Sequence, residues 1–155
     1  EISILSESQR DKLRGQKIGY IFQSFHLLPG YTALENVILG MSFTGNINYD
    51  LAKDLLIRVG LEDRILHTPG QLSVGQRQRV AIARALANDP CLVLADEPTA
   101  NLDTELSQTV IELIKQLCKE QNAAMLLVTH DDQILNHFGS IKNLETINKA
   151  YGAIL

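Results

Sequence analysis

Hydrophobic positions along the chain follow two patterns, short continuous apolar runs and longer stretches with helical spacing. Continuous runs at 18–23, 92–95 and 124–129 predict buried strands. Stretches 50–59 and 104–121 carry apolar residues three and four positions apart, which predicts amphipathic helices. The last two runs are apolar throughout and are joined by one helix, a pattern typical of a parallel β-α-β unit buried on both faces.

Two capping signals predict the start of further helices. Thr32 is followed three positions later by Glu35, and Ser73 by Gln76. In such capping boxes the hydroxyl and the later side chain each bind a free backbone N–H group of the first turn, so Thr32 and Ser73 are the expected N-caps. Residues 32–70 hold no strand pattern, and we expect them to form a separate helical subdomain.

Composition and charge narrow the class of protein. The 155 residues are 45% hydrophobic and 21% charged, as in an ordinary globular domain. The net charge of −4 creates no field that would attract nucleic acid or an anionic membrane, so no nucleic-acid partner is expected. The longest apolar run, 123–128, is far shorter than the ~18 residues of a membrane span, and a cytoplasmic location is expected. Cys91 and Cys118 are expected to be small core residues.

Acidic residues and a histidine follow two of the predicted parallel strands. Ligands of open parallel sheets bind beyond the carboxyl ends of the strands, where Asp96, Glu97 and His130 fall. Asp96 is suited to hold Mg²⁺, through a water, and Glu97 is suited to activate an attacking water as a general base. Two acids in a solvated turn are the alternative, but the apolar strand before them and Pro98 after them favour the site.

The Ser73 capping box has a second interpretation, as an anion site. The Ser73 hydroxyl and the free N–H groups of Gly75 and Gln76 would lie at a helix N-terminus, where the helix dipole favours negative charge. A plain cap is the alternative. The arginines that follow alternate with apolar positions in an acidic chain, which disfavours a nucleic-acid stripe; they are Arg77, Arg79 and Arg84.

The two segments together carry a family resemblance. Leu72-Ser73-Val74-Gly75-Gln76 opens an arginine-studded helix, and Cys91-Leu92-Val93-Leu94-Ala95-Asp96-Glu97-Pro98 follows it closely. At this spacing they resemble the signature segment and the Walker B strand of ATP-binding-cassette (ABC) ATPases. The resemblance covers roughly residues 18–131. It implies a P-loop NTPase-like α/β fold, a parallel sheet core with an inserted helical subdomain.

The resemblance also implies roles for further residues. Gln23 is similar to the Q-loop glutamine that contacts Mg²⁺ and the attacking water, and His130 to the switch histidine that binds the γ-phosphate and orients the catalytic acid. Asn101-Leu102-Asp103 is similar to the D-loop that links the two ATP sites of a dimer. The implied catalytic set is Glu97, His130 and Gln23, with Mg²⁺ held by Asp96 and Gln23. Ser73, Val74, Gly75 and Gln76 would contact ATP held by the partner subunit.

The function implied is that of an ATP-binding and ATP-hydrolysing subunit of an ABC transporter. Such subunits form homo- or heterodimers and energise a membrane permease, on the inner face of the cell membrane. The expected docking surface is the helical subdomain near 22–31. Runs 18–28 and 32–37 are similar to those of ATPases in lipoprotein-release, macrolide-efflux and cyanobacterial glycolipid-export systems. Import and export both stay open.

The resemblance divides the chain into parts. Residues 1–155 would be one partial ABC ATPase domain. The helical subdomain would begin over approximately 24–72 and continue through 88, and 89–155 would form the Walker B and H-loop part of the core.

The sequence departs from the family pattern in three places. No Gly-Lys dipeptide is present, so the P-loop G-x-x-x-x-G-K-[ST] is expected to precede Glu1, and the chain to be N-terminally truncated and unable to bind ATP tightly alone. Val74 replaces a glycine; we expect slower turnover than for a Val74→Gly variant. In the tail 138–155 only Tyr151-Gly152-Ala153-Ile154 is similar to the family's closing strands.

Two other functions fit parts of the pattern. Without a P-loop the chain would be a non-catalytic fragment or a pseudo-subunit that donates its signature to a competent partner. A soluble ABC ATPase of DNA repair, chromosome structure or translation is disfavoured, because the segment between Gln23 and Leu72 is short and holds neither cysteine nor sustained heptads.

Overall fold

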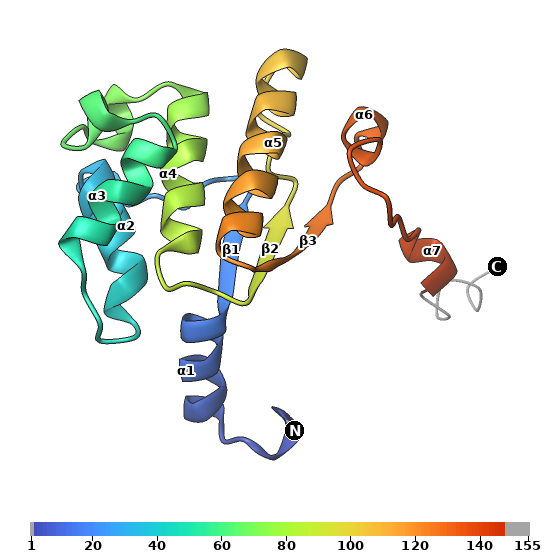
Figure 1. The fold of residues 1–155 in the computed structure, drawn as a ribbon, viewed down its shortest axis with the longest axis horizontal. Helices are drawn as coiled ribbons and strands as arrows, with labels where there is room; N and C mark the ends of the chain where they lie inside the picture. The colour runs from blue at the N-terminus through green and yellow to red at the C-terminus, as the bar shows by residue number, and fades with distance from the viewer. Residues whose placement is uncertain (1, 148–155) are drawn as a thin grey trace.

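A three-stranded parallel sheet forms the centre of the protein. The computed structural model describes residues 2–147, and its strands are β1 (Ile18–Phe22), β2 (Leu92–Asp96) and β3 (Ala124–Val128), in the order β1-β2-β3. Phe22 lies opposite Asp96, and Asp96 opposite Val128, so all three strands end level at one edge of the sheet. The arrows in Figure 1 point to that edge. The predicted α/β class with a parallel sheet is confirmed.

Most of the helices lie to one side of the sheet. They are α2 (Ala33–Ser42), α3 (Tyr49–Arg58), α4 (Val74–Leu86) and α5 (Thr104–Glu120), with 3-10 turns at Glu62–Arg64 and Pro69–Gln71. Helix α4 packs on β1, α5 on β3, and α2 and α3 pack on α4 (Figure 1). Val80, Ile82 and Leu86 of α4 are fully buried and join these layers into one core. No strand interrupts residues 32–70, as predicted.

The ends of the helices follow local side-chain chemistry. Both predicted capping boxes are present: the N–H of Thr32 donates to Oε2 of Glu35 at 2.7 Å, and the N–H of Ser73 donates to Oε1 of Gln76 at 2.9 Å. Gly60 adopts φ +73 after α3, a left-handed conformation that ends a helix at low steric cost.

Helix α4 approaches the sheet closely because β1 carries a glycine. A Cβ built on Gly19 would lie 2.2 Å from the carbonyl oxygen of Ala85. The backbone of α4 therefore rests directly on β1, and no larger residue fits at position 19 without displacing the helix.

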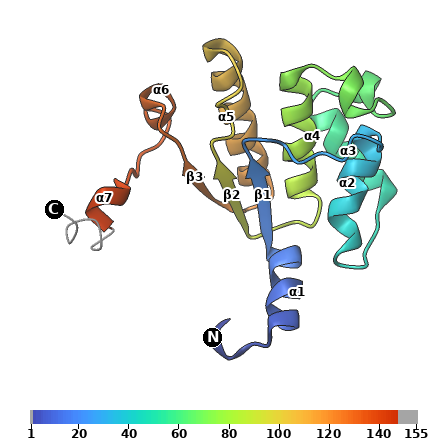
Figure 2. The same cartoon turned by 180° about the vertical axis from the view of Figure 1, so that it is seen from behind.

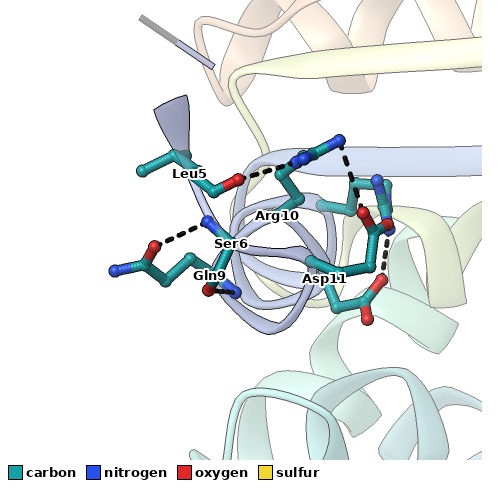
Figure 3. A network of polar contacts seen from close by, with 7 residues as sticks. Leu5, Ser6, Gln9, Arg10 and Asp11 are labelled. Atoms are coloured by element: carbon teal, nitrogen blue, oxygen red, sulfur yellow. Dashed lines mark hydrogen bonds and ion pairs between the residues drawn. The ribbon is translucent and has the colours of Figure 1, made fainter. Parts of the chain in front are cut away.

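Helix α1 (Glu7–Lys17) lies outside the predicted elements. It buries no residue, so it has no apolar stripe that a sequence pattern would show. Local polar contacts stabilise it instead: Ser6 and Gln9 form a capping box, and Nε of Arg10 donates to the Leu5 carbonyl at 3.0 Å (Figure 3). The 3-10 turn Ile2–Ile4 precedes it.

The C-terminal part leaves the body of the molecule after β3. Two short helices, α6 (Asp132–Leu135) and α7 (Leu144–Ile147), project beyond the β3 side of the sheet (Figures 1 and 2). Tyr151-Gly152-Ala153-Ile154, the segment predicted to be similar to the family's closing strands, lies outside the described residues.

Burial corrects two expectations. Strand β3 is not buried on both faces: Leu126 and Val128 are 58% and 55% exposed, whereas Met125 and Leu127 pack on the core. The reason is that α4 and α5 cover one face of the sheet, so alternate residues point away from them. Cys91 is exposed, not a core residue. Over residues 2–147, no helix is long and apolar enough to cross a membrane.

Candidate site at the carboxyl edge of the sheet

Glu97 occupies an unusual backbone conformation directly after β2. Its φ is +46, in the left-handed region that non-glycine residues seldom adopt. Its N–H donates to the Val128 carbonyl of β3 at 2.9 Å, and its carbonyl accepts from the N–H of Ala100 at 3.2 Å. The turn therefore sends the Glu97 side chain toward the end of β3.

The carboxylate of Glu97 is held by the residues that follow β3. Nδ1 of His130 donates to Oε1 at 2.6 Å, the N–H of His130 donates to the same oxygen at 3.0 Å, and Oγ1 of Thr129 donates to Oε2 at 3.3 Å. The Glu97 side chain is 18% exposed, whereas that of His130 is 82% exposed. A half-buried acid is thus fixed in place, beside an imidazole whose other nitrogen is open to solvent.

The protonation of His130 responds to this contact. The hydrogen bond to Glu97 raises the pKa of His130, the charge of Glu97 adds to the effect, and the charge of Asp131 contributes less. The imidazolium is therefore favoured over a wider pH range than in a free histidine.

Asp96 and Gln23 lie where two neighbouring strands end. Asp96 is the last residue of β2 and pairs with Phe22, the last residue of β1, so Gln23 follows directly after β1. Both are exposed. A carboxylate and an amide carbonyl are the hard oxygen ligands that Mg²⁺ accepts. Among residues 2–147 no group of three or more His, Cys, Asp or Glu side chains could hold a metal ion.

The predicted D-loop contacts the same edge. Nδ2 of Asn101 donates to the Gln23 carbonyl at 2.9 Å, joining the turns that follow β2 and β1. Leu102 packs against the core. Asp103 is the N-cap of α5, accepting from the N–H of Leu106 at 2.8 Å.

The four residues at the start of α4 form a second group. Oγ of Ser73 accepts from the N–H of Gln76 at 3.2 Å. Val74 is the first helical residue and is 36% exposed, so the helix accommodates it where the family has glycine. A Cβ on Gly75 would lie 2.6 Å from Cδ2 of Leu106, so this glycine lets α4 pack against α5.

The structure thus brings the predicted residues together in two separate groups. Gln23, Asp96, Glu97, Asn101 and His130 lie at the carboxyl edge of the sheet. Between residues 2 and 147, no hydrogen bond or ion pair connects them with the four residues that begin α4. The two groups therefore lie on different parts of one chain.

Two contributors were missed from the sequence. Thr129 binds Glu97 and also accepts from the N–H of Asp131 at 3.1 Å, and its place beside His130 was the signal available. Arg84 donates to the Phe25 and His26 carbonyls just beyond Gln23; its position on α4 marked it as a cation but not its partner.

Comparison with known proteins shows which proteins the chain is similar to. The family model described as "ABC transporter" matches residues 1–100. The lipoprotein-releasing system ATP-binding protein LolD of Acinetobacter baylyi is 46% identical over 145 residues, covering 91% of this chain and 64% of the relative. LolD 1 of Caulobacter vibrioides is 48% identical over 139 residues, covering 87% and 59%. The chain thus spans about three fifths of the length of these two relatives.

A solved structure shares the fold. The ATP-binding cassette MJ0796, in a dimeric post-hydrolysis state bound to ADP and Pi, superposes with a TM-score of 0.73 at 42% identity, covering 84% of this chain and 60% of that one. The parallel sheet and its helices are therefore those of an ABC cassette.

Proposed function

The chain belongs to the ABC transporter family, and from this premise we propose that it acts within an ATP-binding and ATP-hydrolysing subunit that energises a membrane permease. The observation that carries the proposal is the Glu97 carboxylate, fixed by His130 and Thr129 at the carboxyl edge of the sheet, one residue after Asp96.

The residues of this edge divide the chemistry of ATP hydrolysis among them. Glu97 accepts a proton from the attacking water as general base. His130 holds the carboxylate by Nδ1 and offers its exposed other nitrogen to the γ-phosphate. Asp96 and Gln23 would hold Mg²⁺, Asp96 through a water, and the bound ion would supply positive charge against the charge that develops on the phosphate.

The start of α4 serves the nucleotide of a second subunit. Ser73, Val74, Gly75 and Gln76 present a hydroxyl, backbone N–H groups and the positive end of a 13-residue helix. Their separation from Glu97 supports a head-to-tail dimer, homo- or heteromeric, in which each site combines residues of both subunits. The dimeric assembly of MJ0796, with ADP and Pi, is the precedent. Turnover slower than in a Val74→Gly variant remains our prediction.

The permease would dock on the helical subdomain. An apolar groove on α2 and α3 begins at Tyr31 and is lined by Leu34, Ile38, Leu39, Tyr49 and Leu66. Tyr49 and Leu66 are 60% and 73% exposed. We retain the predicted division into a helical subdomain, approximately 24–72 and continuing through 88, and a core part, 89–155. This arrangement would hold the subunit against the inner face of the cell membrane.

Hydrolysis by the complete reading frame tests the proposal. The coding DNA upstream of Glu1 is read for an in-frame G-x-x-x-x-G-K-[ST], and the full product is purified with its permease in proteoliposomes. We expect Mg²⁺-dependent hydrolysis of ATP that responds to the permease. A complete product that contains the P-loop and shows no such hydrolysis would refute the proposal.

A further inference from the structure

The turn after Gln23 is built from a conformation that its residues disfavour. Phe25 and His26 are consecutive and have φ +60 and +48, both in the left-handed region. Bulky side chains rarely adopt this region, and such a conformation persists only when the surroundings hold it. The N–H of Phe25 donates to the Phe22 carbonyl at 3.2 Å, and that of His26 to the Ser24 carbonyl at 2.6 Å.

Arg84 of α4 binds this turn from outside. Its Nη2 donates to the Phe25 carbonyl at 2.6 Å and its Nη1 to the His26 carbonyl at 2.5 Å. The guanidinium is partly buried, and burial lowers the pKa of Arg84. No acid forms an ion pair with it within residues 2–147, so these two carbonyl dipoles are the groups that compensate its desolvated charge.

The surroundings of Arg84 are adapted to this contact. A Cβ on Gly40 would lie 3.0 Å from Cγ of Arg84, so this glycine of α2 leaves space for the arginine stem. Two turns earlier on α4, the guanidinium of Arg77 lies 5.9 Å from the ring centroid of Phe25, within cation–π range. Two arginines of one helix therefore contact the same turn.

We infer that Arg84 is a positioning residue for Gln23, because it fixes the left-handed turn that holds Gln23 beside Asp96 at the carboxyl edge of the sheet. The inference rests on the proposed function, in which Gln23 contacts Mg²⁺ and water. It adds a physical link between the two surfaces, because α4 is capped by Ser73 at one end and Arg84 near its other end binds the turn after Gln23. A shift of α4 would then be transmitted to Gln23 through the Arg84 guanidinium.

Amide hydrogen exchange, measured on the chain without nucleotide, tests whether Arg84 stabilises the turn at Phe25 and His26. Arg84→Lys removes the paired donors and keeps the charge; we expect the amides of Phe25 and His26 to exchange at least about tenfold faster. Arg79→Lys is the matched control, because Nη1 of Arg79 donates to a different carbonyl, that of Val59, at 2.9 Å. It should leave Phe25 and His26 unchanged. If these amides exchanged at the wild-type rate in Arg84→Lys, the inference that Arg84 stabilises the turn would be wrong.

A second variant covers the case in which Arg84→Lys does not fold. Gly40→Ala keeps the guanidinium but places a methyl group 3.0 Å from Cγ and 3.1 Å from the carbonyl oxygen of Arg84, so it displaces the arginine stem together with this part of α4. We expect the amides of Phe25 and His26 to exchange faster in this variant too. Unchanged exchange would likewise contradict the contact between Arg84 and the turn.

Kinetics of the complete subunit test the positioning role. Arg84→Lys should lower kcat about tenfold or more and raise the Mg²⁺ concentration needed for half-maximal rate. If Arg84 acts through Gln23, adding Arg84→Lys to Gln23→Ala should slow hydrolysis by no more than about twofold beyond Gln23→Ala alone. If the two substitutions instead reduced the rate independently, so that their fold-changes multiplied, the positioning role of Arg84 would be wrong. A wild-type subunit that does not hydrolyse ATP refutes the proposed function instead, and the exchange result is independent of that outcome.

Discussion

At the residue scale, the central contact is that between Glu97 and His130. The left-handed backbone of Glu97 and its N–H bond to Val128 aim the carboxylate at the end of β3, where His130 and Thr129 bind it. Each of these contacts joins the end of β2 to the end of β3, so the Glu97 carboxylate, the proposed general base, is held in place by surrounding residues. This preorganisation is what a general base requires, because a misplaced carboxylate does not reach the water.

The raised pKa of His130 gives a first prediction. Removing the negative charge in Glu97→Gln removes both leading causes of the increase, so the pKa of His130 should fall toward the ordinary value of about 6.5. NMR titration of the imidazole carbon-bound protons measures it. Glu112→Gln, which alters the partner of His137, should leave the titration of His130 unchanged. An unaltered His130 titration in Glu97→Gln would contradict the contact.

The sign of the pH dependence follows from the same pair. Because folding raises the pKa of His130, its contribution to the free energy of unfolding is fully present below the ordinary histidine pKa. It is lost as the pH rises through the raised value. The effect of Glu97→Gln on stability should therefore be larger at pH 5.5 than at pH 9, as urea unfolding at the two pH values would show.

At the element scale, features that depend on residues close together in the sequence could be predicted. Features that depend on packing between elements in three dimensions could not. The capping boxes at Thr32 and Ser73 and the apolar strands came from adjacent residues alone. Helix α1 was missed because it buries no residue and carries no apolar stripe. The exposure of Val128 was missed because the apolar sequence of β3 does not show whether one or both faces of the strand are covered.

The contact of α4 with β1 gives a second prediction. Gly19→Ala places a methyl group 2.2 Å from the Ala85 carbonyl oxygen, so α4 must move away from the sheet. We expect the free energy of unfolding to fall by about 1–3 kcal/mol in urea titrations. Gly30→Ala is the matched control, because a Cβ there meets no atom within 4 Å. Equal stability of the two variants would show that α4 does not rest on β1 as described.

At the scale of the whole molecule, the chain carries two proposed functional surfaces and an exposed face on β3. The carboxyl edge and the start of α4 lie on different elements, so no single sequence motif showed how they are connected. The contact of Arg84 with the Phe25 and His26 carbonyls was found only in the structure. The described residues leave the face of β3 at Leu126 and Val128 uncovered.

Thiol accessibility gives a third prediction, which tests the packing of the molecule as a whole. Cys91 is exposed, whereas Cys118 is buried on α5, where burial raises the pKa of its thiol to about 11. Iodoacetamide at pH 8 should therefore label Cys91 in the native protein and label Cys118 only after unfolding. Mass spectrometry of the tryptic peptides identifies the site. Rapid native labelling of Cys118 would contradict the packing of α5 on the sheet.

The measurement that tests the account most directly is the ATPase rate of the complete subunit carrying Glu97→Gln. Because Glu97 is assigned as general base, kcat should fall by about 10²-fold or more while nucleotide binding is retained. Glu112→Gln is the matched control, since Glu112 also accepts from a histidine Nδ1, at 2.9 Å, but lies on α5 away from the edge of the sheet. It should keep the wild-type rate. If Glu97→Gln hydrolysed ATP as fast as Glu112→Gln, the assignment of the carboxyl edge as the catalytic site would be wrong.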